Sequence, residues 1–197
     1  MSSETNEFKK LVGYPTDNVN QYKFSTDHAY KDLQRTLRGI GKNPKSKEAK
    51  ADCEKALTAF AKKCENGFIK SQEDFDKEHR SLCDQLISIY EKNNFHDFTY
   101  GQAQKWINMS MKYLYCFDEK RFGGILPFIH IAIDNYIFDA INTWKGYDEV
   151  KFYPWSKLKD YSKYLNFQKW FKEQSDGVPL IEEFKLWRAQ RSKEIKE

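Results

Sequence analysis

One segment of the sequence, residues 100–117 (YGQAQKWINMSMKYLYCF), carries apolar side chains in nearly every direction of the helical wheel. A surface helix keeps its apolar side chains on one stripe, so a helix that is apolar all round is normally buried among other elements. The apolar positions are Trp106, Ile107, Met109, Met111, Tyr113, Leu114, Tyr115 and Phe117. We therefore expect the chain to build its fold around this helix.

The segments on either side have the one-sided apolar spacing of surface helices, with capping residues before them and Gly, Asn or Pro at their ends. These patterns predict helices that begin near Ser25, at Ser46, after Ser71, after Asp134, after Pro154-Trp155-Ser156 and at Pro179. Between residues 125 and 133, the run ILPFIHIAI is consistent with a short strand, but Pro127 favours an extended, buried connector.

The whole pattern predicts an all-α fold, a single globular domain of about seven helices around the buried central one. Residues 1–22 have few apolar anchors and are expected to form a flexible N-terminal arm, followed by one helical domain over residues 23–197. No internal repeat or linker divides the chain.

Composition adds a few limits. The net charge of +4 comes from 33 basic and 29 acidic residues, which permits nucleic-acid binding without requiring it. No apolar run approaches the ~20 residues of a membrane span, and the start is polar, so we expect a cytoplasmic protein without membrane contact. The cysteines are widely spaced within helical patterns, which predicts buried free thiols: Cys53, Cys64, Cys83 and Cys116.

Motifs that mark common enzyme classes are missing from the sequence. It has no phosphate-binding G-x-x-x-x-G-K-[ST] loop, no G-x-G-x-x-G, no H-E-x-x-H and no G-x-S-x-G. Its four histidines are scattered, without the spacing of metal ligands. We therefore expect no cofactor and no metal site.

The polar residues of the central helix are the best candidates for a functional site. Lys105, Asn108 and Lys112 share one face at i, i+3 and i+7. If that face lines a cavity, a partly desolvated lysine would have a lowered pKa and could act as an amine nucleophile. The alternative is that these residues form the solvent-facing stripe of a core helix.

The segment FTYGQAQKWINMSMKYL, followed by an apolar connector and HIAIDNYIFDAI, resembles the centre of helix-hairpin-helix DNA glycosylases of the eight-oxoguanine type. The resemblance spans about forty residues and matches Gly101 to the hairpin glycine, Lys105 to the nucleophile and Asp134 to the helix-capping aspartate. It implies excision of a damaged, flipped-out base through a Schiff base on the lysine. The same segment is also similar to small bacterial proteins to which we attach no activity.

Two functional hypotheses follow. The first is a nucleic-acid-associated protein, with or without catalysis, in which Lys105 and Asp134 are catalytic and the nucleic acid is bound by Gly101, Gln104, Asn108, Lys112, Lys159 and Lys163. The second is a non-catalytic domain that docks a protein partner through exposed aromatic residues such as Trp170 and Trp187.

Overall fold

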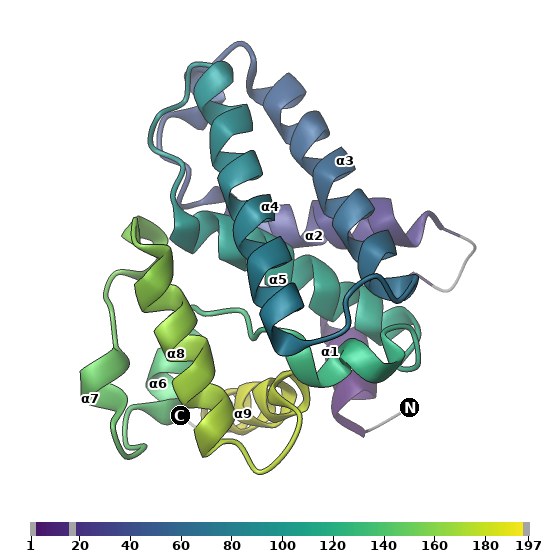
Figure 1. Ribbon diagram of the computed structural model, residues 1–197, viewed down its shortest axis with the longest axis vertical. Coiled ribbons are helices and arrows are strands. Elements are labelled where there is room, and N and C mark those ends of the chain that lie inside the picture. Colours follow the sequence, from purple (N-terminus) through teal and green to yellow (C-terminus); the bar gives the residue numbers. More distant parts are fainter. Residues whose placement is uncertain (1–2, 16–18, 195–197) are drawn as a thin grey trace.

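The chain is helical throughout the part that the computed structural model describes, residues 3–15 and 19–194 (Figure 1). Over these residues there are nine α-helices: α1 (Ser3–Val12), α2 (Gln21–Gln34), α3 (Ser46–Glu65), α4 (Gln72–Lys92), α5 (Tyr100–Phe117), α6 (Asn135–Ile141), α7 (Tyr147–Val150), α8 (Tyr161–Gln174) and α9 (Pro179–Glu194). Short 3₁₀ helices join them: η1 (Ile40–Lys42), η2 (Gly123–Phe128) and η3 (Trp155–Lys157). The predicted all-α, single-domain fold is confirmed, but about seven helices was too few.

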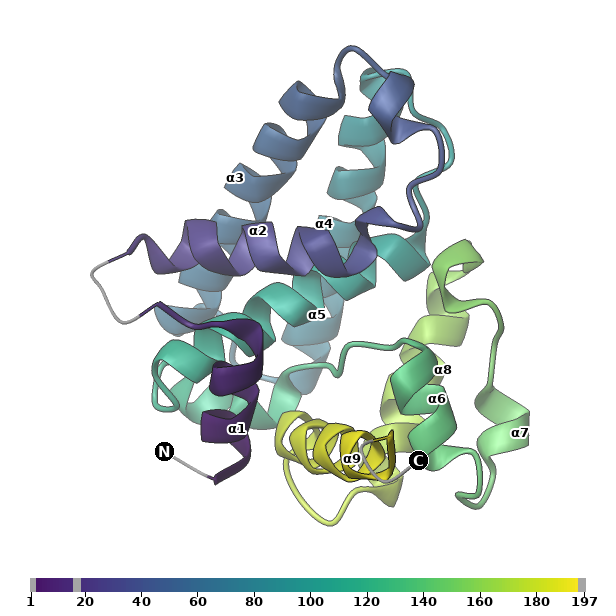
Figure 2. The same cartoon turned by 180° about the vertical axis from the view of Figure 1, so that it is seen from behind.

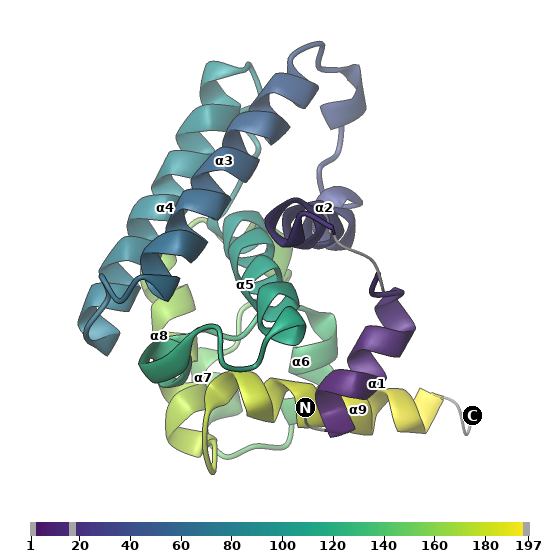
Figure 3. The same cartoon turned by 90° about the vertical axis from the view of Figure 1, so that its right-hand side faces the viewer.

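The central helix is α5, as predicted. Every residue from 101 to 116 is buried, and Trp106 and Ile107 are completely enclosed. Thr99 begins the helix with a capping box, in which its side chain accepts from the Gln102 backbone and the Gln102 side chain accepts from the Thr99 N–H. Helix α2 packs along α5, and α3, α4, α8 and η3 also contact it (Figure 3).

Two parts of the fold surround α5. Helices α3 and α4 form a long antiparallel hairpin that projects to one side (Figures 1 and 3). The predicted turn and cap are confirmed, because Gly67 has the positive φ of 70° and Ser71 accepts a hydrogen bond from Asp74 N. On the other side, α9 packs against α6 and α1 (Figure 2).

A helix stands where the sequence analysis predicted an N-terminal arm. Residues 1–2 and 16–18 of the predicted arm lie outside the described residues, but Ser3–Val12 is helical. Its Phe8 is only 3% exposed and makes edge contacts with the rings of Phe184 and Trp187. The prediction was wrong for α1 because contacts to a distant part of the chain hold this helix on α9: Phe8 packs on its aromatic rings, and Glu7 pairs with Arg188.

Two helix starts differ from their predicted positions. Helix α2 begins earlier, capped by Asn20, and Thr26 lies inside it with its hydroxyl bonded to the Tyr22 carbonyl. Helix α8 begins later, capped by Asp160. The residues where it was predicted to begin form η3 instead, which packs on α5. Serine, threonine and aspartate have capping oxygens in several neighbouring positions, so local sequence cannot choose among them.

The predicted segment 125–133 divides in two. Residues 125–128 belong to η2, and residues 129–133 form an extended connector without a strand partner among the described residues, so the connector prediction is correct only for 129–133. Asp134 then caps α6 by accepting from Ile137 N, as predicted. Residues 129–133 are buried, so their backbone groups need partners from side chains.

Two further expectations concern cysteines and membranes. The four cysteines are buried free thiols, as predicted: Cys53, Cys64, Cys83 and Cys116. Among the helices of the described ranges, we find none that combines the length and the apolar character needed to cross a bilayer.

Candidate functional site

Residues of α1, α2, α5, α6 and α9 line a cavity of about 340 Å³, which we call the central pocket. Figure 2 shows the arrangement of these helices. Its walls combine charged groups with large aromatic and apolar side chains, namely Phe8, Val12, Met109, Tyr113, Tyr136, Ile137, Trp155 and Trp187. Its volume lies at the lower end of the range for small-molecule pockets, about 300–1,000 Å³. The pocket can therefore accept a ligand the size of a small ring system.

Lys105 and Asp134 meet in this pocket. Lys105 lies in the first half of α5 and Asp134 is the N-cap of α6, and Lys105 Nζ is 2.5 Å from Asp134 Oδ2. The other oxygen, Oδ1, accepts from Ile137 N, so the carboxylate is fixed by the start of its own helix. The two residues assigned by resemblance to catalysis thus form one ion pair on a concave surface.

The electrostatics of this pair differ from the lowered lysine pKa predicted above. Burial by itself lowers the pKa of Lys105, but the nearby carboxylates of Asp134 and Asp32 outweigh burial and raise it. Burial raises the pKa of Asp134, whereas Lys105 and the Ile137 N–H lower it, and the net pKa lies below its ordinary value. The resting pair is therefore an ammonium and a carboxylate.

A second ion pair lies deeper in the wall. Lys112, two turns after Lys105, is 2.8 Å from Glu183 of α9, and both side chains are almost fully buried. The ammonium also lies 4.5 Å from the ring centroid of Phe184 and 5.1 Å from that of Phe8. Glu183 Oε2 accepts from Ala132 N at 3.3 Å, so this pair ties α5, α9 and the extended segment together.

Asp32 of α2 is the third carboxylate of the central pocket. Tyr113 donates its hydroxyl hydrogen to Asp32 Oδ2 at 2.9 Å. Burial raises the pKa of Asp32 above its ordinary value, although Lys105 and the Tyr113 hydroxyl act in the opposite direction. The central pocket therefore contains two carboxylates that are ion-paired with a lysine, Asp134 and Glu183, and a third, Asp32, that is bonded to a tyrosine hydroxyl instead.

Three other predicted site residues, Gly101, Gln104 and Asn108, do not line the central pocket. The Gly101 N–H donates to Leu158 O at 3.1 Å, and a Cβ at this position would come within 1.8 Å of the Trp155 carbonyl oxygen. This glycine allows η3 to pack on α5. Gln104 spans the extended segment by donating to Ile133 O at 2.9 Å and accepting from Ile133 N at 3.1 Å.

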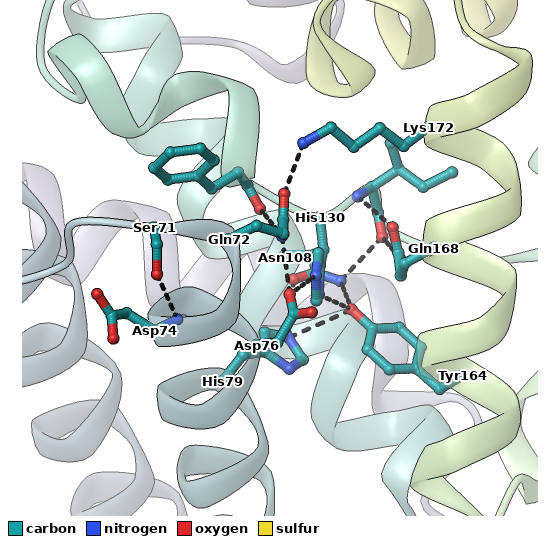
Figure 4. Close-up of polar contacts among 12 residues, drawn as sticks. Ser71, Gln72, Asp74, Asp76, His79, Asn108, His130, Tyr164, Gln168 and Lys172 are labelled. Carbon is teal, nitrogen blue, oxygen red and sulfur yellow. Dashed lines mark hydrogen bonds and ion pairs between the residues drawn. The ribbon is translucent and has the colours of Figure 1, made fainter.

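Asn108 belongs to a separate group of buried polar side chains, the histidine cluster, formed by Asp76, His79, Asn108, His130, Tyr161 and Tyr164. Figure 4 labels five of them, all but Tyr161. Its side-chain N–H groups donate to Ile131 O and Tyr164 Oη, both at 2.8 Å. Gln168 of α8 also binds the extended segment 129–133. Its side-chain oxygen accepts from Ile131 N, and its side-chain nitrogen donates to Ile131 O.

The histidine tautomers follow from their partners. His130 Nε2 faces the Asp76 carboxylate at 2.9 Å and must carry hydrogen, so Nδ1 accepts from the Tyr164 hydroxyl at 2.9 Å. His79 Nε2 donates to Asn108 Oδ1 at 3.1 Å, and its Nδ1 faces the Tyr161 hydroxyl at 3.0 Å. Burial lowers the pKa of both histidines, so they are neutral and every ring nitrogen is used.

The predicted solvent-facing stripe on α5 does not exist, because Lys105, Asn108 and Lys112 are all at most 5% exposed. The shared face also divides: Lys105 and Lys112 line the pocket, whereas Asn108 turns to the histidine cluster. The solvent-facing alternative was therefore wrong, and the cavity hypothesis holds for Lys105 and Lys112 but not for Asn108.

The remaining predicted residues lie elsewhere. Lys159 and Lys163 are exposed, before and on α8, and neither lines the central pocket. Trp170 and Trp187 were predicted to be exposed docking residues, which is wrong for Trp170, while Trp187 is partly buried. Trp170 is 9% exposed and donates to Lys145 O, and Trp187 packs on Phe8.

Sequence reasoning missed Asp32, Glu183 and the histidine cluster. Glu183 could have been found, because it shares a helical face with Leu180, Phe184 and Trp187, and a carboxylate on an apolar face needs a buried partner. His79 carried the same signal on the inner face of α4. No sequence signal marks Asp32, because its place in the pocket depends on which face of α2 packs towards α5.

The described residues contain no group of three or more His, Cys, Asp or Glu side chains placed to hold a metal ion. Comparisons of the chain with models of protein families, with curated proteins and with solved structures find no match. The functional argument therefore depends on the geometry of the site and on the resemblance of the central segment.

Proposed function

We propose that the protein is a nucleic-acid-associated helical protein that receives a single base in the central pocket, with Lys105 as the amine nucleophile and Asp134 as its partner. The observation that supports this most directly is the convergence of these two residues, 29 positions apart, on one concave surface at 2.5 Å. The resemblance to helix-hairpin-helix glycosylases assigns the same two residues to the reaction.

The composition of the pocket suits an aromatic ring bearing polar edges. Tyr113, Tyr136 and Trp155 provide ring surfaces, and bases stack well on aromatic side chains. Two exposed residues, Lys31 of α2 and Arg35 at its C-cap, also line the pocket and supply positive charge for the phosphates of a flipped nucleotide.

In the proposed reaction, Lys105 attacks the anomeric carbon of the sugar and Asp134 stabilises the positive charge that develops there. Lys105 must first lose a proton. Because Asp134 and Asp32 raise its pKa, the reactive amine is a small fraction at neutral pH. The rate of the reaction is therefore expected to rise with pH.

Borohydride trapping on duplex DNA that contains an abasic site or an oxidised base tests this mechanism. The wild type is expected to form a covalent adduct, and Lys105→Arg, which keeps the ion pair with Asp134, is expected to form none. The matched control is Lys77→Arg on the exposed face of α4, which should trap like the wild type. The absence of a wild-type adduct, or an undiminished adduct in Lys105→Arg, would contradict the catalytic mechanism.

Lys159 and Lys163 provide the proposed contacts to the phosphate backbone. Filter binding against salt tests this part, because each phosphate contact steepens the loss of affinity with added salt. Replacing both lysines by alanine should weaken binding and flatten the salt dependence, while replacing Lys47 and Lys55 on α3 should change neither. If no DNA or RNA binds at low salt, nucleic-acid association is wrong.

The alternative, a non-catalytic protein-interaction domain, is favoured by one surface. Phe68 is 70% exposed beside an apolar groove of about 570 Å³ between α3 and α4. Self-association through this groove is testable by light scattering. Phe68→Ser should abolish a dimer, whereas Tyr153→Ser, at another highly exposed position, should not.

A further inference from the structure

The charged groups of the central pocket differ in how much of their hydrogen-bonding capacity is used. Asp134 uses one oxygen for Lys105 and the other for Ile137 N, and Glu183 uses its two oxygens for Lys112 and Ala132 N. Lys105 has three hydrogens and gives one to Asp134. Within the described part of the chain, Asp32 accepts one hydrogen bond, from Tyr113, and its Oδ1 accepts none.

We propose that Asp32 is the proton-carrying residue of this pocket, a further catalytic residue that takes the proton from Lys105 and delivers it to the departing base. This inference rests on the proposed function. Its basis is geometric: Asp32 and Lys105 line the same cavity from α2 and α5, and Tyr113 fixes the Asp32 carboxylate through Oδ2, which leaves Oδ1 without a hydrogen-bond donor among the described residues.

The step balances in protons and charge. Lys105 ammonium gives one proton to the Asp32 carboxylate, and the neutral amine attacks the anomeric carbon. The glycosidic C–N bond breaks with its electron pair on the base, and the Asp32 carboxyl returns the proton to that nitrogen. The protonated aminal on Lys105 then opens to a Schiff base, with its proton passing to the sugar ring oxygen.

Asp134 is closer to Lys105 but less suited to this role. Its pKa is lowered by Lys105 and by the N–H at the start of α6, so it resists protonation. Burial raises the pKa of Asp32, which makes its carboxylate the better proton acceptor and also allows it to donate. Asp134 remains the anion opposite the developing positive charge.

Two measurements on Asp32→Asn test the proposal because they are expected to change in opposite directions. Removing the carboxylate should lower the pKa of Lys105, so labelling of Lys105 by a small amine reagent, followed by mass spectrometry, should become faster. The rate of borohydride trapping on DNA should nevertheless fall by about 10²-fold or more, the usual effect of losing an acid–base group.

Asp32→Glu should recover part of the trapping rate, and Asp139→Asn, an exposed carboxylate of α6, should leave both rates unchanged. Circular dichroism confirms that each variant is folded. If Asp32→Asn traps as fast as the wild type or faster, the carboxylate acts only through its charge and this proposal alone is wrong. Unchanged Lys105 labelling also overturns it. No trapping by the wild type overturns the proposed function as well.

Discussion

The central pocket and the histidine cluster both include polar side chains of α5, but they differ in how far their buried polar groups are satisfied by hydrogen bonds within the chain. In the histidine cluster, the ring nitrogens and the Asn108 amide are all satisfied by this chain, and every group in it is neutral except Asp76. In the central pocket, charged groups line a cavity, and Lys105 and Asp32 retain unused bonding capacity. A satisfied cluster specifies the fold, whereas an unsatisfied one beside a cavity is available to a ligand.

Breaking the deeper ion pair should have the largest effect on stability. Lys112→Met leaves Glu183 as an uncompensated buried charge, so we expect a loss of about 3–5 kcal/mol in the free energy of unfolding. Lys185→Met removes the partner of Glu182 in an exposed pair and should cost less than about 1 kcal/mol. Urea unfolding compares the two, and equal losses would mean that the pair at Lys112 is not buried in solution.

Gly101→Ala tests how closely η3 packs on α5. The added Cβ would overlap the Trp155 carbonyl oxygen, a backbone atom that cannot rotate away, so we expect a loss of about 3 kcal/mol. Gly124→Ala meets nothing within 4 Å and is the matched control. A thermally stable Gly101→Ala protein would place η3 farther from α5.

Removing one hydroxyl from the histidine cluster should have an intermediate effect. Tyr164→Phe leaves His130 Nδ1 without a donor and removes an acceptor of Asn108, which should cost about 1–3 kcal/mol. Tyr153→Phe, at an exposed position, should be neutral. Loss of stability without loss of borohydride trapping would confirm that this cluster is structural, and loss of trapping at full stability would contradict that.

The pH dependence of stability should separate the two regions. Folding lowers the pKa of His79 and of His130. As the pH falls, these two histidines therefore become protonated in the unfolded chain at a higher pH than in the folded protein. The stability from neutral burial is complete above the unfolded value of 6.5 and declines as pH falls below it, by up to about 1.4 kcal/mol per pH unit for each histidine. The contribution of Asp134, whose pKa is lowered, declines only below its ordinary value of 3.8.

Urea unfolding between pH 7.5 and 5 measures this slope. His79→Gln should reduce it, and His96→Gln, an exposed residue, should not. A flat stability profile in the wild type would mean that the buried histidines are not neutral.

The helices and several of their ends were predictable because their causes are local. The apolar spacing of α3 and α4, the cap at Ser71 and the aspartate that starts α6 are each visible within a few residues of sequence. Helix α1 and the start of α8 were not predictable, because Phe8 and η3 are held by parts of the chain far away in sequence.

The candidate site was predictable only in part. The resemblance named Lys105 and Asp134, but the spacing along α5 placed Asn108 beside them, and the fold turned it to the extended segment instead. Asp32 and Glu183 enter from helices whose packing on α5 no local pattern describes.

What the sequence determined by itself is a helical protein built around one helix that is apolar on all sides. What only the tertiary structure decided is the role of each polar residue on that helix. Because α5 is buried all round, each of its polar groups must find a partner, and the partners come from other elements. Gln104 and Asn108 bind the backbone of the connector, Lys112 binds Glu183, and Lys105 binds Asp134 at the central pocket.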